Sequence, residues 1–160
     1  METHKHELLV VGGGPAGYVA AIRAAQLGID VACIDENDRF GGTCLRVGCI
    51  PSKALLESSH LYHDAKHGLS AHGITVEKVK LDLDALMHRK NEIVKTLTGG
   101  IDLLFNKRGV KAYRGRGVFR DINTVEVSGQ DNVRIEADQI LIASGSNAAT
   151  LRGVEEDGVR

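Results

Sequence analysis

The segment LLVVGGGPAG, residues 8–17, constrains the fold more than any other part of the sequence. An apolar run over residues 7–11 stops at three glycines, and a helical pattern over residues 15–26 follows. A second apolar run, residues 30–35, comes after Gly28, where we expect the helix to end. This order predicts a strand–turn–helix–strand unit of the βαβ type, and therefore an α/β fold with a parallel sheet.

The glycines of this turn match G-x-G-x-x-G, which is typical of dinucleotide-binding sites. Gly12 permits the tight turn out of the strand, Gly14 lets the backbone approach a pyrophosphate, and Gly17 lets the helix pack close to the sheet. The helix that starts at Pro15 and Ala16 adds free N–H groups and a partial positive charge. We predict a dinucleotide site here, the alternative being a purely structural glycine turn.

A carboxylate about 20 residues after the first glycine commonly accepts hydrogen bonds from the ribose hydroxyls of the dinucleotide. Asp35 ends the second apolar run near this spacing, and its neighbour Glu36 is the alternative. The turn itself does not distinguish FAD from a nicotinamide cofactor.

The middle of the chain predicts two long helices. Residues 43–66 have helical spacing, but Pro51 lies inside this segment. Because proline within a helix costs about 3 kcal/mol, we expect a distortion around residues 48–51. A second helix is predicted over residues 82–105, with its end near Gly109.

The last third of the chain switches to a period of two. Residues 110–119, 124–128 and 133–136 predict a small antiparallel meander. Residues 139–143 predict a final buried strand, which ends at Ser144-Gly145-Ser146. We therefore assign residues 1–146 to one domain segment, and the polar residues 147–160 to the start of a connection.

The overall composition excludes several classes of protein. The net charge is −1, which argues against a surface for nucleic acid or anionic membrane. No apolar run approaches the roughly 20 residues needed to cross a bilayer, and the start, METHKHE, is polar rather than signal-like. A cytoplasmic location is therefore expected. Three cysteines in such a chain do not form a disulfide framework.

Two of these cysteines, Cys44 and Cys49, lie in GGTCLRVGCIP just after the predicted ribose-binding acid. A metal site is disfavoured because the spacing is not C-x-x-C and no second cysteine pair exists; no metal ligand is predicted. A structural disulfide is disfavoured by the compartment, and two inert core thiols by the glycine-rich surroundings. A redox pair fits best, because a nearby helix start favours thiolate and a close pair can exchange with a disulfide.

Lys53 lies close to this pair in the sequence and adds positive charge. Cys33 lies inside the second predicted strand, where we expect a buried and inert thiol.

The stretch GGTCLRVGCIPSKALL, joined to the glycine turn, resembles the pyridine nucleotide–disulfide oxidoreductases. The segments YVAAIRAAQLG, KALLESSHLYHDA, LTGGIDLLFNKRGV and ILIASGS extend the resemblance over nearly the whole chain. CIPSKALL is more similar to the lipoamide branch than to glutathione or mercuric reductases, which remain alternatives. The resemblance implies a Rossmann-like FAD-binding domain of the three-layer ββα type, with NAD bound on a second domain.

The resemblance also implies roles for individual residues. Cys49 would face the flavin, Cys44 would exchange with the substrate disulfide, and Lys53 would lie near the flavin ring. The residues implied to contact FAD are Gly12, Gly14, Pro15, Ala16, Gly17, Asp35, Glu36, Gly42, Thr43, Cys44, Lys53, Gly117, Ser144, Gly145 and Ser146. Asp35 replaces the usual Glu of the family, and Arg46 replaces a frequent Asn between the cysteines.

The family reaction passes two electrons from protein-bound dihydrolipoamide to the cysteine pair, and then through FAD to NAD. The implied partners are a lipoyl domain of a 2-oxo acid dehydrogenase or glycine cleavage complex, and a second copy in a homodimer. Family members also carry a second glycine motif for NAD and a C-terminal His–Glu pair, which this sequence lacks. We therefore expect an incomplete N-terminal part that is inactive alone. The alternative is a non-catalytic nucleotide-binding fragment.

Overall fold

A computed structural model describes residues 1–150, 152 and 153 of the chain. Its regular elements, in chain order, are β1 (Glu2–Val11), α1 (Pro15–Gln26), β2 (Val31–Asp35), α2 (Gly42–Arg46), α3 (Cys49–His63), a π-helical turn (Asp64–Gly68), a 3-10 turn (Leu69–His72), α4 (Leu83–Arg108), β3 (Lys111–Arg114), β4 (Arg116–Phe119), β5 (Thr124–Ser128) and β6 (Val133–Ile142).

The strands form one hydrogen-bonded sheet in the order β3-β2-β1-β6-β5-β4. The first four strands in this order are parallel, as the βαβ pattern predicts, and β5 runs antiparallel to its two neighbours, β6 and β4. β6 belongs to both parts, since its whole length pairs with β1 while residues 133–136 also pair with β5. The two parts are therefore continuous through one long strand.

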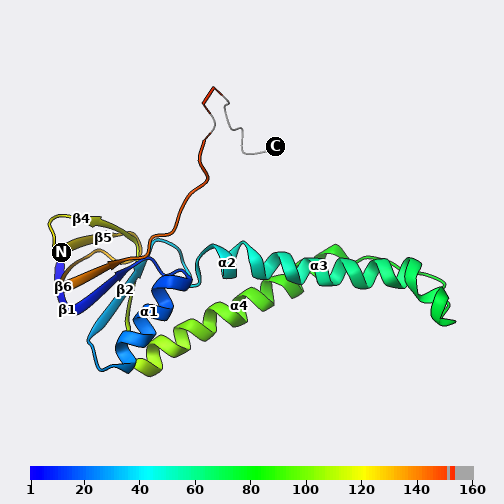
Figure 1. Ribbon diagram of the computed structural model, residues 1–160, viewed down its shortest axis with the longest axis horizontal. Coiled ribbons are helices and arrows are strands. Elements are labelled where there is room, and N and C mark those ends of the chain that lie inside the picture. The colour runs from blue at the N-terminus through cyan, green and yellow to red at the C-terminus, as the bar shows by residue number, and fades with distance from the viewer. Residues whose placement is uncertain (151, 154–160) are drawn as a thin grey trace.

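The centre of the parallel sheet, at β2 and residues 9 and 10 of β1, is buried on both faces, which creates two cores. On one face, Val10 and Cys33 pack with residues of α1 and α4, including Phe105. On the other face, the neighbouring strand residues Leu9 and Ile34 pack with residues of the meander. Figure 1 shows α1 and α4 below the sheet, and β4 and β5 above it. The arrangement confirms the predicted α/β fold with three layers: helices, parallel sheet and antiparallel meander.

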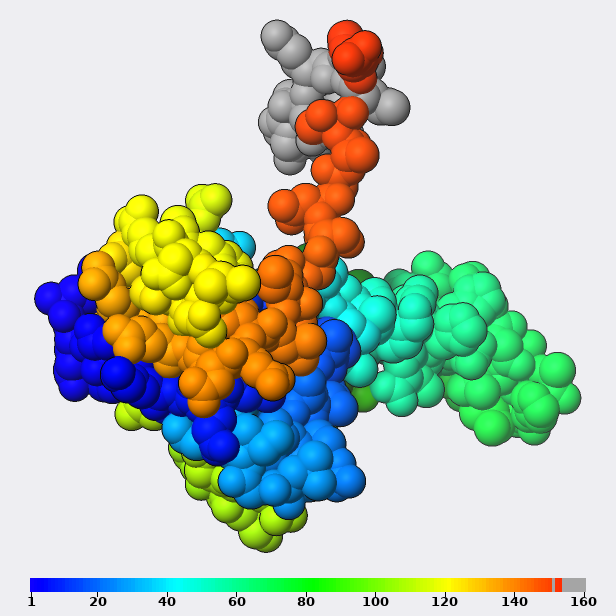
Figure 2. Space-filling view, turned by 60° about the vertical axis from the view of Figure 1, so that its left-hand side comes forward, coloured from blue at the N-terminus to red at the C-terminus, as the bar shows by residue number. Residues whose placement is uncertain are grey.

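α3 and part of α4 extend beyond the sheet as an arm (Figures 1 and 2). The two helices contact each other along the arm, where Arg89 of α4 forms an ion pair with Glu57 of α3 at 2.7 Å. The predicted distortion is confirmed, because a break at residues 47 and 48 separates α2 from α3 and Pro51 is the third residue of α3. The predicted end at Gly109 is also confirmed: this residue follows α4 with φ +74°.

Four predicted strands differ from the structure. Residues 110–119 form two strands rather than one, because β3 joins the parallel sheet beside β2 while β4 pairs with β5 at the far edge. Residues 133–136 and 139–143 were predicted as separate strands but form the single strand β6, held along its length by β1. The first strand begins at Glu2 rather than at residue 7, because its start pairs with β6 as well.

Beyond β6, residues 143–150 have no regular structure and extend away from the domain (Figure 1). The predicted connection, residues 147–160, is described only at 147–150, 152 and 153, so the rest of it lies outside the described residues. Across the ranges 1–150 and 152–153, no helix is both long and apolar enough to span a membrane.

Candidate functional site

The glycine turn connects β1 to α1 at the carboxyl end of the parallel sheet. The Gly12 amide donates to the Ile34 carbonyl at 2.9 Å, and the Ala143 amide donates to the Val11 carbonyl at 2.7 Å. These bonds bring the ends of β1, β2 and β6 together. In open α/β sheets, ligands bind at this edge.

Two of the turn glycines are required by close packing. A Cβ atom added at Gly12, where φ is +107°, would lie 2.2 Å from the Ala143 carbonyl oxygen. A Cβ atom at Gly17 would lie 1.7 Å from the Gly12 carbonyl oxygen. Any larger residue at Gly17 would push α1 away from β1, which confirms the close helix–strand approach predicted there.

Asp35 is almost fully buried, and its carboxylate holds the glycine turn. The Gly13 amide donates to Asp35 Oδ2 at 2.6 Å, while the backbone and side-chain N–H groups of Asn37 donate to Oδ1 at 2.9 and 2.7 Å. Phe40 packs beneath Gly13, where an added Cβ atom would lie 2.1 Å from the ring. The guanidinium of Arg114 covers this ring at 3.6 Å from its centroid.

A cleft of about 670 Å³ opens over this turn. It is lined by the glycine turn and helix start, the end of β2, α2 and the segment after β6: Gly12, Gly14, Pro15, Ala16, Asp35, Glu36, Asn37, Gly42, Thr43, Cys44, Arg46, Ala143, Ser144, Gly145, Ser146 and Asn147. A recess of about 210 Å³ adjoins it and shares Gly12, Asp35 and Ser144. Gly117 and Arg116 of β4 lie in this recess.

The structure therefore brings most of the predicted cofactor-binding residues to one continuous cleft. Three predicted site residues line neither the cleft nor the adjoining recess. Gly17 lies beneath the turn and acts through packing, while Lys53 and Cys49 lie on α3 and are exposed. Whether the lining residues contact FAD stays a prediction.

The two cysteines of the pair lie at different positions relative to the cleft. Cys44 is the third residue of α2, half-buried, and lines the cleft, while Cys49 is the first residue of α3 and exposed. Both are free thiols. A hydrogen bond to the Cys49 side chain is the main cause that raises the pKa of Cys44, and the positive charge of Lys53 opposes the rise.

The raised pKa of Cys44 differs from the expected effect of a helix start, which would favour thiolate. α2 has only five residues, so its dipole is small and the neighbouring sulfur dominates. The Cys49 thiol is nevertheless close enough to be the main influence on the pKa of Cys44. Cys33 is fully buried, as expected, and burial raises the pKa of its thiol to about 12.

Several residues in or beside the cleft and the recess were not predicted from the sequence. Gly13 is the middle glycine of the motif, and only the position of the Phe40 ring makes its lack of a side chain necessary. Asn37 supports Asp35 through the Asx turn that the order Asp-x-Asn allows. Arg116 carried no local signal for a place in the recess, because β4 reaches it from a distant part of the chain. Arg46 lies among predicted residues of α2 but was noted only as a difference from the family.

Groups of three or more His, Cys, Asp or Glu side chains arranged to hold a metal ion do not occur in residues 1–150, 152 and 153. His60, His63 and His67 lie on the arm, where His63 and His67 stack with ring centroids 5.2 Å apart.

The βαβ sheet, the glycine turn and the thiol pair beside the cleft define a dinucleotide-binding domain of the disulfide-reductase class. Sequence comparison agrees with this class. The chain belongs to the pyridine nucleotide-disulphide oxidoreductase family, whose model matches residues 6–160.

Among curated relatives, dihydrolipoyl dehydrogenase of Manduca sexta is 50% identical over 156 residues, 97% of this chain. Dihydrolipoyl dehydrogenase 1, mitochondrial, of Arabidopsis thaliana and leghemoglobin reductase of Vigna unguiculata are each 47% identical over 96% of this chain. The chain spans only 30–31% of the length of these relatives.

A solved structure of the flavoprotein disulfide reductase RclA from Escherichia coli, a Cu(II) complex, is also similar. It is 26% identical and aligns with a TM-score of 0.72, covering 93% of this chain and 30% of that one. This likeness agrees with the Rossmann-like fold described above.

Proposed function

We propose that residues 1–146 are the first FAD-binding segment of a dihydrolipoyl dehydrogenase, and that residues 147–160 begin the connection to an NAD-binding domain. The observation that carries the proposal is the position of Cys44, which lines the dinucleotide cleft while its sulfur neighbours that of Cys49. The relatives that bear this name, at 47–50% identity, support the choice of reaction.

The residues of the cleft fit a dinucleotide. Gly14 has no close neighbour on its open side, since a Cβ atom there would meet only Gly42 Cα, at 3.7 Å. The backbone is therefore accessible to a pyrophosphate, beside the N-terminus of α1. Glu36 is exposed and borders both the cleft and the recess with Gly117, so its carboxylate is available to ribose hydroxyls.

Asp35, the acid predicted to bind the ribose, also holds the glycine turn through hydrogen bonds. Both of its oxygens already accept hydrogen bonds from Gly13 and Asn37. A carboxylate has about four lone-pair sites, so one further bond to a ribose hydroxyl is compatible with these. We propose that Asp35 shapes the turn and that Glu36 shares the binding of the ribose.

The cysteine pair performs the thiol–disulfide exchange. In the oxidised pair, a thiolate of dihydrolipoamide attacks Cys44 Sγ, forms a mixed disulfide and releases Cys49 as a thiolate. The second substrate thiolate attacks the substrate sulfur of the mixed disulfide, which closes the lipoamide disulfide and releases the Cys44 thiolate. The two thiol protons of the substrate pass to a base, and two electrons remain on the cysteine pair. The residues that line the cleft would hold FAD, which would supply an acceptor for these two electrons and a route to NAD.

The distribution of protons within the reduced pair supports separate roles for the cysteines. The hydrogen bond that raises the pKa of Cys44 keeps a proton on Cys44. We propose Cys49 as the thiol that faces the flavin. Lys53 provides the positive charge near the pair.

The proposed partners belong to the whole protein. They are a lipoyl domain of a 2-oxo acid dehydrogenase or glycine cleavage complex, and a second copy that supplies a His–Glu base pair. A cytoplasmic location stays a prediction, to be tested by cell fractionation; four of the relatives at 47% identity are named mitochondrial.

Reduction of the purified protein by dihydrolipoamide tests this function. We expect a yellow protein that releases FAD on denaturation and whose flavin is bleached by dihydrolipoamide, with the Cys44→Ser variant keeping FAD but not bleaching. Protein that folds without binding FAD would support the non-catalytic alternative. Bleaching by glutathione, but not by dihydrolipoamide, would assign the chain to another branch of the family.

A further inference from the structure

Arg46 is the only positively charged residue among the described residues that line the cleft. It ends α2, two positions after Cys44. Its Nε atom is buried and has no hydrogen-bond partner within the described part of the chain. An unpaired buried donor costs about 1–3 kcal/mol, and more when it is charged. The cleft therefore lacks an acceptor that Arg46 requires.

The described protein groups of the cleft do not supply this acceptor. The Asp35 carboxylate accepts from Gly13 and Asn37, and no ion pair joins Arg46 to Glu36 in residues 1–150, 152 and 153. The Cys44 sulfur is not a hydrogen-bond partner of this Nε atom either. Arg46 also lines the cleft, so a ligand that fills this space lies beside its side chain.

The surroundings of Arg46 favour an anionic ligand group. The same cleft contains the N-terminus of α1, a 12-residue helix, with the open backbone of Gly14 beside it. A helix N-terminus and a guanidinium both attract negative charge, and arginine matches the geometry of phosphate oxygens through two parallel N–H donors. The cleft thus combines backbone donors and one fixed positive charge.

We propose that Arg46 is a ligand-binding residue that donates hydrogen bonds to the diphosphate group of the dinucleotide. This inference rests on the proposed function, because it takes FAD as the ligand. It adds a side-chain anchor for the diphosphate to the backbone donors of the glycine turn. It also explains why a charged residue has a buried, unpaired Nε atom between the two cysteines.

Binding of three probes to the purified protein, measured by calorimetry, tests the proposal. FAD contains both the diphosphate and the flavin ring, ADP contains the diphosphate alone, and riboflavin contains the ring alone. The variant Arg46→Met keeps the apolar stem and removes the charge. We expect it to weaken binding of FAD and of ADP about tenfold or more, and to leave riboflavin binding unchanged. Arg46→Lys should recover part of the loss, since lysine keeps the charge without the fork of donors.

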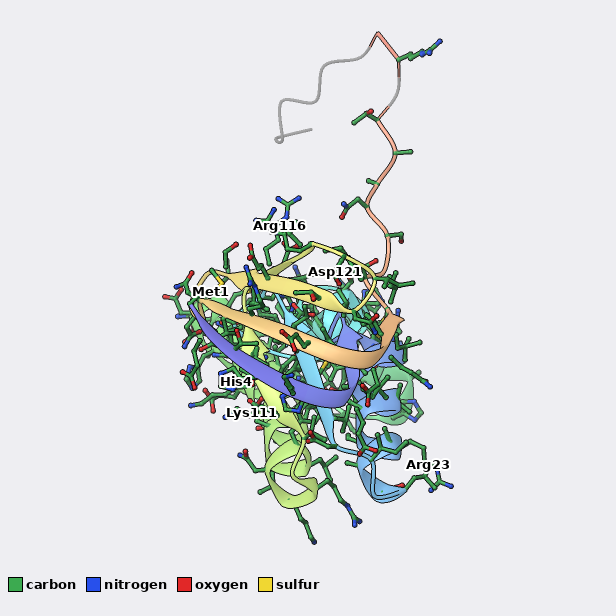
Figure 3. The ribbon with its side chains drawn as sticks, turned by 90° about the vertical axis from the view of Figure 1, so that its left-hand side faces the viewer. Met1, His4, Arg23, Lys111, Arg116 and Asp121 are labelled. Atoms are coloured by element: carbon green, nitrogen blue, oxygen red, sulfur yellow. The ribbon has the colours of Figure 1, made fainter. Side chains whose placement is uncertain are left out.

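Arg23→Met is the matched control. Arg23 lies in the last turn of α1, and Figure 3 shows it at the opposite end of the domain from Arg116, which borders the recess. This control should leave the affinity for all three probes unchanged. Circular dichroism and the unfolding midpoint test whether each variant is folded. If Arg46→Met does not fold, Arg46→Gln is measured in its place.

The possible failures are distinguishable. Unchanged ADP affinity in Arg46→Met would overturn the inference, and weaker FAD binding in that case would assign the guanidinium to the flavin ring. Either result leaves the proposed function in place, because the unsubstituted protein still binds FAD. Unsubstituted protein that binds neither FAD nor ADP would overturn both the proposed function and the inference.

Discussion

The Gly13 amide donates a hydrogen bond to the Asp35 carboxylate at 2.6 Å, which ties the glycine turn to the end of the neighbouring strand β2. The bond is buried, and the same carboxylate also accepts two bonds from Asn37. One acid thus determines the shape of the turn.

Replacing Asp35 by Ala should destabilise the protein by about 1–3 kcal/mol, because the buried Gly13 amide loses its acceptor. Asp35→Asn keeps one acceptor oxygen and should cost less. Urea unfolding measures the change, with Asp38→Ala, an exposed neighbour, as the control. An Asp35→Ala protein as stable as Asp38→Ala would contradict the role of the carboxylate in holding the turn.

Two Gly→Ala substitutions should have opposite effects on stability. At Gly17 the new Cβ atom overlaps the Gly12 carbonyl, so we expect a loss at the upper end of the ~1–3 kcal/mol typical of overpacking. Gly99 lies within α4 with open space around it, so Gly99→Ala should stabilise the protein by about 0.5–1 kcal/mol through helix propensity. Thermal unfolding of both variants checks the contrast, and equal midpoints would contradict it.

The thiols should differ in reactivity and in pH dependence. Cys33, buried and with its pKa raised to about 12, should not react with iodoacetamide in the folded protein. The Cys49→Ala variant removes the main cause that raises the pKa of Cys44. Alkylation of Cys44 should therefore reach its half-maximal rate at a lower pH in this variant than in the unsubstituted protein.

Mass spectrometry of the alkylated peptides follows each thiol separately. Cys33→Ala is the control and should leave the pH profile of Cys44 unchanged. A Cys44 profile that moves to higher pH in Cys49→Ala would show that Cys49 does not hold the proton on Cys44.

Glu126 of the meander should contribute to the loss of folding stability at acid pH. Its carboxylate accepts from Arg134 at 2.7 Å and from Arg120 at 2.6 Å, and these bonds hold the pKa of Glu126 below its ordinary value of 4.5. A carboxylate with a lowered pKa stabilises the fold above pH 4.5, and this stability is lost as pH falls through the lowered value. Glu126→Gln should therefore lose less stability than the unsubstituted protein between pH 6 and the acid range, about pH 3–4.

Urea unfolding at several pH values measures this difference. Glu92→Gln is the matched control, since Glu92 is exposed and its nearest cation, Lys95, is 3.8 Å away. Parallel stability–pH curves for Glu126→Gln and the unsubstituted protein would exclude a role for these bonds.

Local signals in the sequence predicted α1 to the residue, because Pro15 and Gly28 mark its ends. They also predicted the break before Pro51 and the end of α4 at Gly109. The division of residues 110–119 was not predictable in this way. Its cause is distant: β3 pairs with β2, and Gly115 passes so close to Ser128 that an added Cβ atom would lie 2.8 Å from its carbonyl oxygen.

In the candidate site, too, local signals in the sequence predicted some residues, while contacts between distant segments were not predictable. The G-x-G-x-x-G spacing and the acid after the second strand predicted the residues at the centre of the cleft, since both are local to one βαβ unit. The contribution of Arg116 depends on how β4 folds over the sheet, which no local pattern specifies. Arg46 was noted only as a difference from the family, because a buried unpaired donor is visible only in three dimensions.

The most direct test of the thiol pair as a redox partner of the flavin is the absorbance of the FAD-bound protein after partial reduction. A thiolate beside an oxidised flavin gives a long-wavelength band. We predict this band in the unsubstituted protein and in Cys44→Ser, and its loss in Cys49→Ser. A band that persists in Cys49→Ser would contradict the assignment of Cys49 as the sulfur that faces the flavin.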